Sequence, residues 1–128
     1  MKQRQKGQIA VVSSLAGFCG IPSSPVYSAS KAAVRVYAEV LRGNLSKYGI
    51  AVNVICPGYV KTPMTTENKF WMPFLMTPQK TASIIKKGLE KNQSRIAFPF
   101  PLYFVVWFGA LFFRCLINFI FSQISKKS

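Results

Sequence analysis

The sequence contains no histidine, no aspartate and only three carboxylate side chains, those of Glu39, Glu67 and Glu90. The missing residue types exclude a Ser-His-Asp triad, an aspartic dyad and a histidine-based zinc site, and we expect no metal site. The scatter of the glutamates disfavours a hydrolase that uses paired carboxylates. Any acid–base chemistry must therefore depend on tyrosine, lysine, serine or cysteine side chains.

Cysteine is also scarce, with three widely separated residues, Cys19, Cys56 and Cys115, and no CxxC pair. This pattern indicates neither a disulfide framework nor a zinc cluster, and small buried hydrophobic side chains are the simplest interpretation. The basic segment 1–6 is not followed by an apolar run, so we expect no secretory signal. We therefore expect a cytoplasmic protein.

Positive charge is abundant: 17 lysines and arginines in 128 residues give a formal net charge of +14. Half of the residues are hydrophobic and eleven are phenylalanine, which excludes a disordered basic tail. Apart from the segments 2–6, 86–87 and 126–127, the cations are spread singly and accompany no binding motif, so we expect no nucleic-acid partner. A basic face beside a membrane, or an acidic region on a partner, explains the charge equally well.

Local patterns predict an α/β fold with a parallel sheet. The continuous apolar run at 9–13 is typical of a buried parallel strand, 50–56 is a second segment of this kind, and 95–98 would be a third strand. Between the first two runs, apolar residues recur at helical spacing from Val26 to Leu45, and Thr77 begins a second helix. Three strands make an incomplete domain of this class, because the first strand would keep an unpaired edge.

A tyrosine and a lysine open the first predicted helix, at Tyr27 and Lys31. This spacing places both on one helix face, where the ammonium favours the phenolate form of the tyrosine. Ser14 follows the first strand, at the carboxyl edge where parallel sheets present functional groups. When the Tyr–Lys pair is considered alone, a purely structural explanation is sufficient: a solvated helix face on which the tyrosine ring is packed.

Two further motifs accompany the pair in order. The three segments are Ser13-Ser14-Leu-Ala-Gly17, Tyr27-Ser-Ala-Ser-Lys31 and Asn53-Val-Ile-Cys-Pro57-Gly58-Tyr-Val60-Lys-Thr62. Over residues 7–98 the sequence resembles the short-chain dehydrogenase/reductase family, with its Ser…Tyr-x-x-x-Lys centre and Pro-Gly-x-Val-x-Thr segment. The resemblance implies the C-terminal half of a Rossmann-type doubly wound parallel sheet over 1–98, followed by a hydrophobic tail over 99–128.

The resemblance also implies a site. Ser14 and Tyr27 would bind the substrate oxygen, with Tyr27 as proton donor in reduction and base in oxidation, and Lys31 would hold the nicotinamide ribose. Contacts to an NAD or NADP cofactor, with NADP slightly favoured, would come from Tyr27, Lys31, Pro57, Gly58, Val60 and Thr62. In this pattern Asn53 is structural. A homodimer through the helix that bears Tyr27 is usual in the family.

Two parts of the family pattern are missing. The sequence has neither the glycine-rich phosphate loop nor the residue that selects between NAD and NADP. We therefore expect an amino-truncated chain, which would bind dinucleotide poorly when alone. The alternatives are a non-catalytic remnant of such an enzyme and a small basic membrane-surface protein without enzymatic activity.

The tail is uncharged from Ile96 to Phe113. Its length suits a transmembrane segment, whereas Pro99, Pro101 and Arg114 disfavour one. A helix on a membrane surface, or a lid and dimer contact over the substrate pocket, are the other interpretations. The apolar segment 70–76 belongs to the same surface or to a substrate loop. Such a lining would suit an apolar carbonyl or alcohol substrate.

Overall fold

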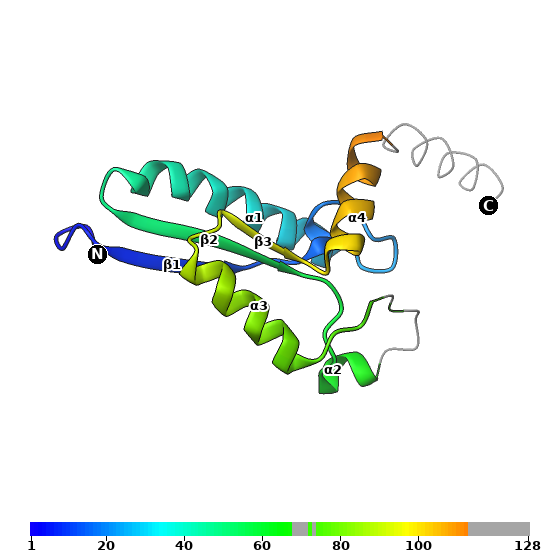
Figure 1. The fold of residues 1–128 in the computed structure, drawn as a ribbon. Helices are drawn as coiled ribbons and strands as arrows, with labels where there is room; N and C mark the ends of the chain where they lie inside the picture. The colour runs from blue at the N-terminus through cyan, green and yellow to red at the C-terminus, as the bar shows by residue number, and fades with distance from the viewer. Residues whose placement is uncertain (68–71, 73, 113–128) are drawn as a thin grey trace.

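The computed structural model describes residues 1–67, 72 and 74–112 (Figure 1). Its centre is a parallel sheet in the order β1-β2-β3, formed by β1 (Gly7–Val12), β2 (Ile50–Pro57) and β3 (Arg95–Phe98). In register, Gly7 of β1 lies opposite Ile50, and Pro57 at the end of β2 lies opposite Phe98. The predicted α/β fold with a parallel sheet is confirmed.

Two helices cover the opposite faces of the sheet. Helix α1 (Pro25–Ser46) connects β1 to β2, and α3 (Pro78–Glu90) connects β2 to β3. Alternate residues of β2, among them Val52 and Val54, pack with the core on the α1 side, whereas Ile55 packs with the core beside α3. Because side chains alternate along a strand, a strand covered on both faces needs apolar side chains on both. This explains why every residue of β2 except Asn53 is apolar.

The face of α1 that packs against the sheet is not the apolar stripe that the sequence suggests. From that stripe, Val26 is 81% exposed and Tyr37 is 67% exposed. The buried positions are instead the small residues Ser28 and Ala38. Small side chains let the helix lie close to its neighbours, and Leu41 and Leu45 also pack against the core, whereas Val26 and Tyr37 are left on the outer side. Helical spacing therefore predicted the helix but not its buried face.

The inner edge of the sheet is open, as expected from the sequence. Among the described residues, β1 is hydrogen-bonded only to β2. Its side chains alternate between partly buried and exposed, and Val12 is 56% exposed. The backbone edge and one face of β1 are thus available for a further element, which a parallel sheet normally has.

Asn53 of β2 has a structural role. Its side chain is fully buried and donates hydrogen bonds to the Asn92 side chain at 3.1 Å and to the Gln93 carbonyl at 2.7 Å. It also accepts a hydrogen bond from the Gln8 amide at 2.9 Å. These contacts tie the turn between α3 and β3 to the middle of the sheet.

The remaining elements lie at the carboxyl end of the strands (Figure 1). They are the short helix η1 (Leu15–Gly17), α2 (Pro63–Thr66) and α4 (Phe100–Phe112), which follows β3 directly. No helix within the described residues is long and apolar enough to cross a membrane. The rest of the predicted tail, with Arg114 and Cys115, lies outside the described residues.

Candidate active site

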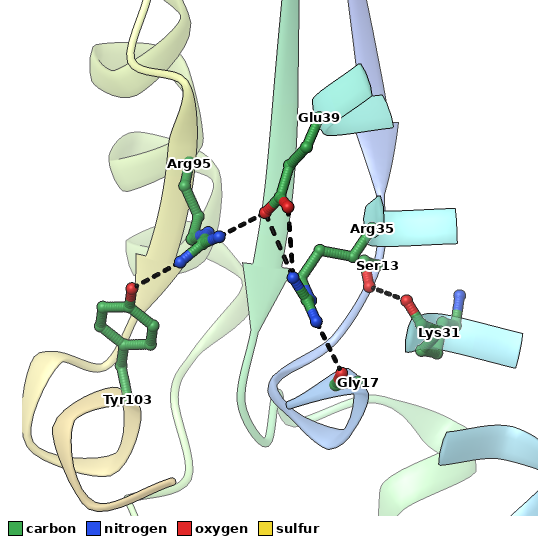
Figure 2. Close-up of polar contacts among 7 residues, drawn as sticks. All are labelled: Ser13, Gly17, Lys31, Arg35, Glu39, Arg95 and Tyr103. Atoms are coloured by element: carbon green, nitrogen blue, oxygen red, sulfur yellow. Dashed lines mark hydrogen bonds and ion pairs between the residues drawn. The ribbon is translucent and has the colours of Figure 1, made fainter. Parts of the chain in front are cut away.

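A hydrogen bond connects the end of β1 to the first turns of α1. Ser13 is buried, and its hydroxyl donates a hydrogen bond of 2.7 Å to the backbone carbonyl of Lys31 (Figure 2). Ser14 is the N-cap of η1, where its hydroxyl oxygen accepts from the Ala16 N–H at 3.1 Å. The two serines thus have different roles, because Ser13 holds the helix in place while Ser14 begins the next turn.

A close backbone approach supports this junction. A Cβ atom on Gly17 would lie 2.8 Å from the carbonyl carbon of Lys31 and 2.9 Å from the nitrogen of Ala32. Real side chains do not tolerate such distances, so only glycine allows η1 to lie against α1 at this point. No pattern in the sequence indicated this requirement.

Tyr27 and Lys31 lie on the same face of α1, as their spacing predicts. The helix begins at Pro25, a position that suits proline because its missing N–H would have no helical partner. Tyr27 is about half exposed, and the Lys31 Nζ lies 5.6 Å from the centre of its ring. At this distance the ammonium interacts favourably with the face of the aromatic ring.

The Pro-Gly segment continues from the end of β2. Gly58 donates a backbone hydrogen bond of 2.8 Å to the Phe98 carbonyl. A Cβ atom on Gly58 would lie 3.0 Å from atoms of Leu102 and Pro99, so the space beside this glycine is occupied by the start of α4. This places α4 against the same motif that the family resemblance connects with the cofactor.

Val60 and Thr62 have defined local roles in the same segment. Val60 forms an isolated parallel bridge with Met76. Thr62 is the N-cap of α2 and forms a capping box with Thr65, in which each side chain bonds the other residue's backbone N–H. The structure therefore brings both residues to the carboxyl edge of the sheet, where they stabilise the turn that leaves β2.

Sequence reasoning missed a polar cluster beneath the site (Figure 2). The carboxylate of Glu39 forms ion pairs with Arg35, one helical turn away, and with Arg95 of β3. Arg95 also donates to the Tyr103 hydroxyl at 3.2 Å, and Arg35 donates to the Gly17 carbonyl at 3.5 Å. The cluster joins η1, α1, β3 and α4. Only the Arg35–Glu39 spacing was visible in the sequence.

Aromatic contacts complete this cluster. The ring of Phe18 packs against both guanidinium groups, with ring-centre distances of 4.5 Å to Arg35 and 5.0 Å to Arg95. Burial acts to lower the pKa of Arg95, but its hydrogen bonds with Tyr103 and Glu39 outweigh burial and raise that pKa above the usual value. Arg95 is therefore a permanent positive charge that holds Glu39 in place.

A cavity lies beside the Tyr–Lys pair rather than on it. It has a volume of about 650 Å³ between η1, the loop that follows, α1 and α4. Its lining includes Phe18, Ile21 and Arg35, but not Ser14, Tyr27 or Lys31. The Tyr–Lys pair is thus not part of the lining of this cavity.

A parallel sheet with helices on both faces and polar residues at the carboxyl ends of its strands is a Rossmann-like arrangement. The same arrangement is found in a short-chain dehydrogenase from Sphingobium yanoikuyae, solved in complex with NADPH, with a TM-score of 0.68 and 23% identity. The similarity covers 77% of this chain and 40% of that one. It establishes the fold.

Sequence comparisons establish the family. Residues 1–73 match the family model for short chain dehydrogenases. An uncharacterized oxidoreductase of Myxococcus xanthus is 40% identical over 102 residues, which are 80% of this chain and 40% of that protein. The ketoacyl reductase HetN of a Nostoc species is 34% identical over 100 residues, or 75% of this chain and 35% of that one.

The chain belongs to the short-chain dehydrogenase family. It spans well under half the length of either of these two relatives. The family membership implied by the three motifs is therefore confirmed.

Proposed function

We propose that this chain carries the catalytic centre of an NAD(P)-dependent oxidoreductase that interconverts an apolar alcohol and its ketone or aldehyde. The observation that carries the proposal is the pairing of Tyr27 with Lys31, beside the strand end that bears Ser14. When bound, the nicotinamide supplies hydride transfer to or from the substrate carbon. The protein must then hold the substrate oxygen and move its proton.

Each of the three side chains has a distinct role in this proposal. Ser14 accepts from the Ala16 N–H, which fixes its oxygen while its own hydroxyl hydrogen can be donated to the substrate oxygen. Tyr27 gives a proton to that oxygen in reduction and removes it in oxidation. The ammonium of Lys31 stabilises the phenolate that remains and offers donors to the ribose hydroxyls.

The residues present fit the nicotinamide end of the cofactor. Lys31 offers hydrogen-bond donors, and Pro57, Gly58, Val60 and Thr62 lie at the same edge of the sheet. The sequence holds no glycine-rich loop for the pyrophosphate, so we propose that a polypeptide segment outside this sequence binds that group. NADP is favoured over NAD because the similar Sphingobium structure holds NADPH.

Several observations support the finer parts of the proposal. The exposed side chains of Phe74 and Leu75 support an apolar substrate. The start of α4 at Phe100 supports the division of the chain into a domain over 1–98 and a tail over 99–128. The exposed apolar side chains on α1, such as Tyr37, support a homodimer through that helix. The free thiols of Cys19 and Cys56 support a reducing compartment, the cytoplasm.

The test combines cofactor binding with turnover. NADPH fluorescence titration and NADPH oxidation with an apolar ketone are measured for the protein that includes the pyrophosphate-binding segment. The same measurements are made for its Tyr27→Phe variant and for the control Tyr37→Phe, which changes an exposed tyrosine on the same helix. Tyr27→Phe should lower kcat by about 100-fold or more while the Kd for NADPH and the urea midpoint stay unchanged, because only the proton donor is lost. Tyr37→Phe should leave both quantities unchanged.

Other results would favour the alternatives. Wild-type turnover by Tyr27→Phe would show that this tyrosine is not the proton donor. No saturable binding of NADPH, even when the segment that binds the pyrophosphate is present, would favour the non-catalytic remnant or a small basic membrane-surface protein. Equal turnover of small polar ketones would refute the apolar substrate class.

A further inference from the structure

Helix α4 has two different apolar faces. One face, which includes Leu102 and Tyr103, packs against the core beside α1. On the other face Phe100, Phe104, Phe108 and Phe112 form a ladder, with successive ring centres 6.4, 5.1 and 4.6 Å apart. All four rings are exposed, Phe100 to 72%. A stacked row of exposed aromatic rings is unusual for a protein surface in contact only with water.

The ladder continues onto a neighbouring segment. A hollow of about 560 Å³ is lined by Phe74 and Leu75 together with Phe100 and Pro101, and Lys80 also lines it. The aromatic face is defined here as the exposed large apolar residues of this region: Phe74, Leu75, Phe100, Phe104, Val105, Trp107, Phe108, Leu111 and Phe112. It contains no carboxylate, and α4 projects from the carboxyl end of the sheet (Figure 1).

We propose that the aromatic face docks this protein onto the surface of an anionic lipid bilayer. The 13 described residues of α4 extend about 20 Å, and the exposed rings run along this length. Tryptophan and phenylalanine on one side of a helix are suited to the boundary between headgroups and acyl chains. The body of the domain provides the polar side that α4 itself lacks.

Charge favours a bilayer over a second copy of the chain. Two copies docked through this face would each bring a formal charge of +14 to the contact, whereas an anionic membrane attracts that charge. Lys80 stands at the hollow beside Phe100, within reach of lipid headgroups. The aromatic face therefore combines an apolar surface with a cation at its border.

Docking would also place the candidate active site at the membrane. Pro99 and Leu102, at the start of α4, occupy the space beside Gly58. A bilayer against α4 therefore lies close to the carboxyl edge of the sheet, and an apolar substrate could pass from the lipid to that edge. This consequence rests on the proposed function, whereas the docking itself does not.

The experiment measures partition of the full chain onto vesicles by flotation. Vesicles of phosphatidylcholine are compared with vesicles that also contain phosphatidylglycerol. The test variant combines Phe104→Ser with Phe108→Ser. The control is Val12→Ser, which changes an exposed apolar residue of β1, away from α4 and from the α1 surface proposed for the homodimer. The test variant should partition about tenfold more weakly or worse, because two phenylalanine rings no longer enter the lipid, and the control should match the wild type.

A charge variant and a spectroscopic signal complete the design. Lys80→Gln should weaken binding to anionic vesicles by up to about fivefold, with Lys47→Gln, an exposed lysine near the far end of α1, as its control. In a Trp71→Phe chain, Trp107 is the single tryptophan, and its emission should shift to shorter wavelength when anionic vesicles are added.

Three results would overturn the proposal. The first is equal flotation of the Phe104/Phe108 variant and the wild type. The second is equal binding to neutral and anionic vesicles. The third is a dimer in light scattering that the Phe104/Phe108 variant abolishes, without vesicle binding by either protein. Flotation needs neither cofactor nor turnover, so a failure of the proposed enzymatic activity is distinguishable from a failure of docking.

Discussion

Replacing Gly17 by alanine should destabilise the protein specifically at the junction of η1 and α1. The added Cβ would lie 2.8 Å from the Lys31 carbonyl carbon and 2.9 Å from both the Lys31 oxygen and the Ala32 nitrogen. Carbon atoms in favourable contact are about 3.5–4.0 Å apart, so η1 and α1 must separate by up to about an ångström. These neighbours are backbone atoms of a helix and cannot rotate away as a side chain could.

The expected cost is about 1–3 kcal/mol in the free energy of unfolding, the usual range for overpacking a close contact. Separation would also strain the hydrogen bond from Ser13 to the Lys31 carbonyl and the one from Arg35 to the Gly17 carbonyl. Under the proposed function, a shift of this size between Ser14 and Lys31 should lower turnover by about 100-fold.

Urea unfolding followed by circular dichroism measures the stability change, with Gly20→Ala as the matched control. Gly20 lies in the loop after η1, and a Cβ atom on this glycine would have no atom within 4 Å. The control should unfold at or slightly above the wild-type urea concentration, because alanine restricts the unfolded chain. Equal midpoints for Gly17→Ala and Gly20→Ala would refute the close-approach argument.

Two other perturbations test the core. Burial raises the pKa of the Cys56 thiol to about 11, although Arg95 and Arg35 act to lower it. The folded state therefore holds this proton more tightly than the unfolded state, in which the thiol has its ordinary pKa of 9.0. The stability that results is present below pH 9 and is lost as the pH rises toward 11. Urea midpoints across this range should fall more steeply for the wild type than for Cys56→Ala, and parallel curves would contradict the assignment. Asn53→Ala should lower the free energy of unfolding by about 2 kcal/mol, because the Gln93 carbonyl loses its buried donor. The control Asn44→Ala, at an exposed site on α1, should change the urea midpoint little. Similar losses of stability for both variants would argue against the buried network.

Local sequence patterns were sufficient to predict the strands, the helices α1 and α3, and the pairing of Tyr27 with Lys31. The largely apolar segment of β2 identified a strand covered on both faces, and Thr77 marked the start of α3. The pairing of Tyr27 with Lys31 follows from helix geometry alone, since residues four apart share a face. These features are predictable because each depends on residues within one or two turns of each other.

The tertiary structure decided the features that depend on contacts between distant segments. The sequence determined that residues 25–46 form an amphipathic helix, but only packing against the sheet selected the side with Ser28 and Ala38 for burial. The ion pair between Glu39 and Arg95 joins residues 56 positions apart, and the need for glycine at position 17 arises from the backbone of α1. Helix and strand periodicity are properties of a single segment, whereas these contacts exist only once two segments have been brought together by the fold.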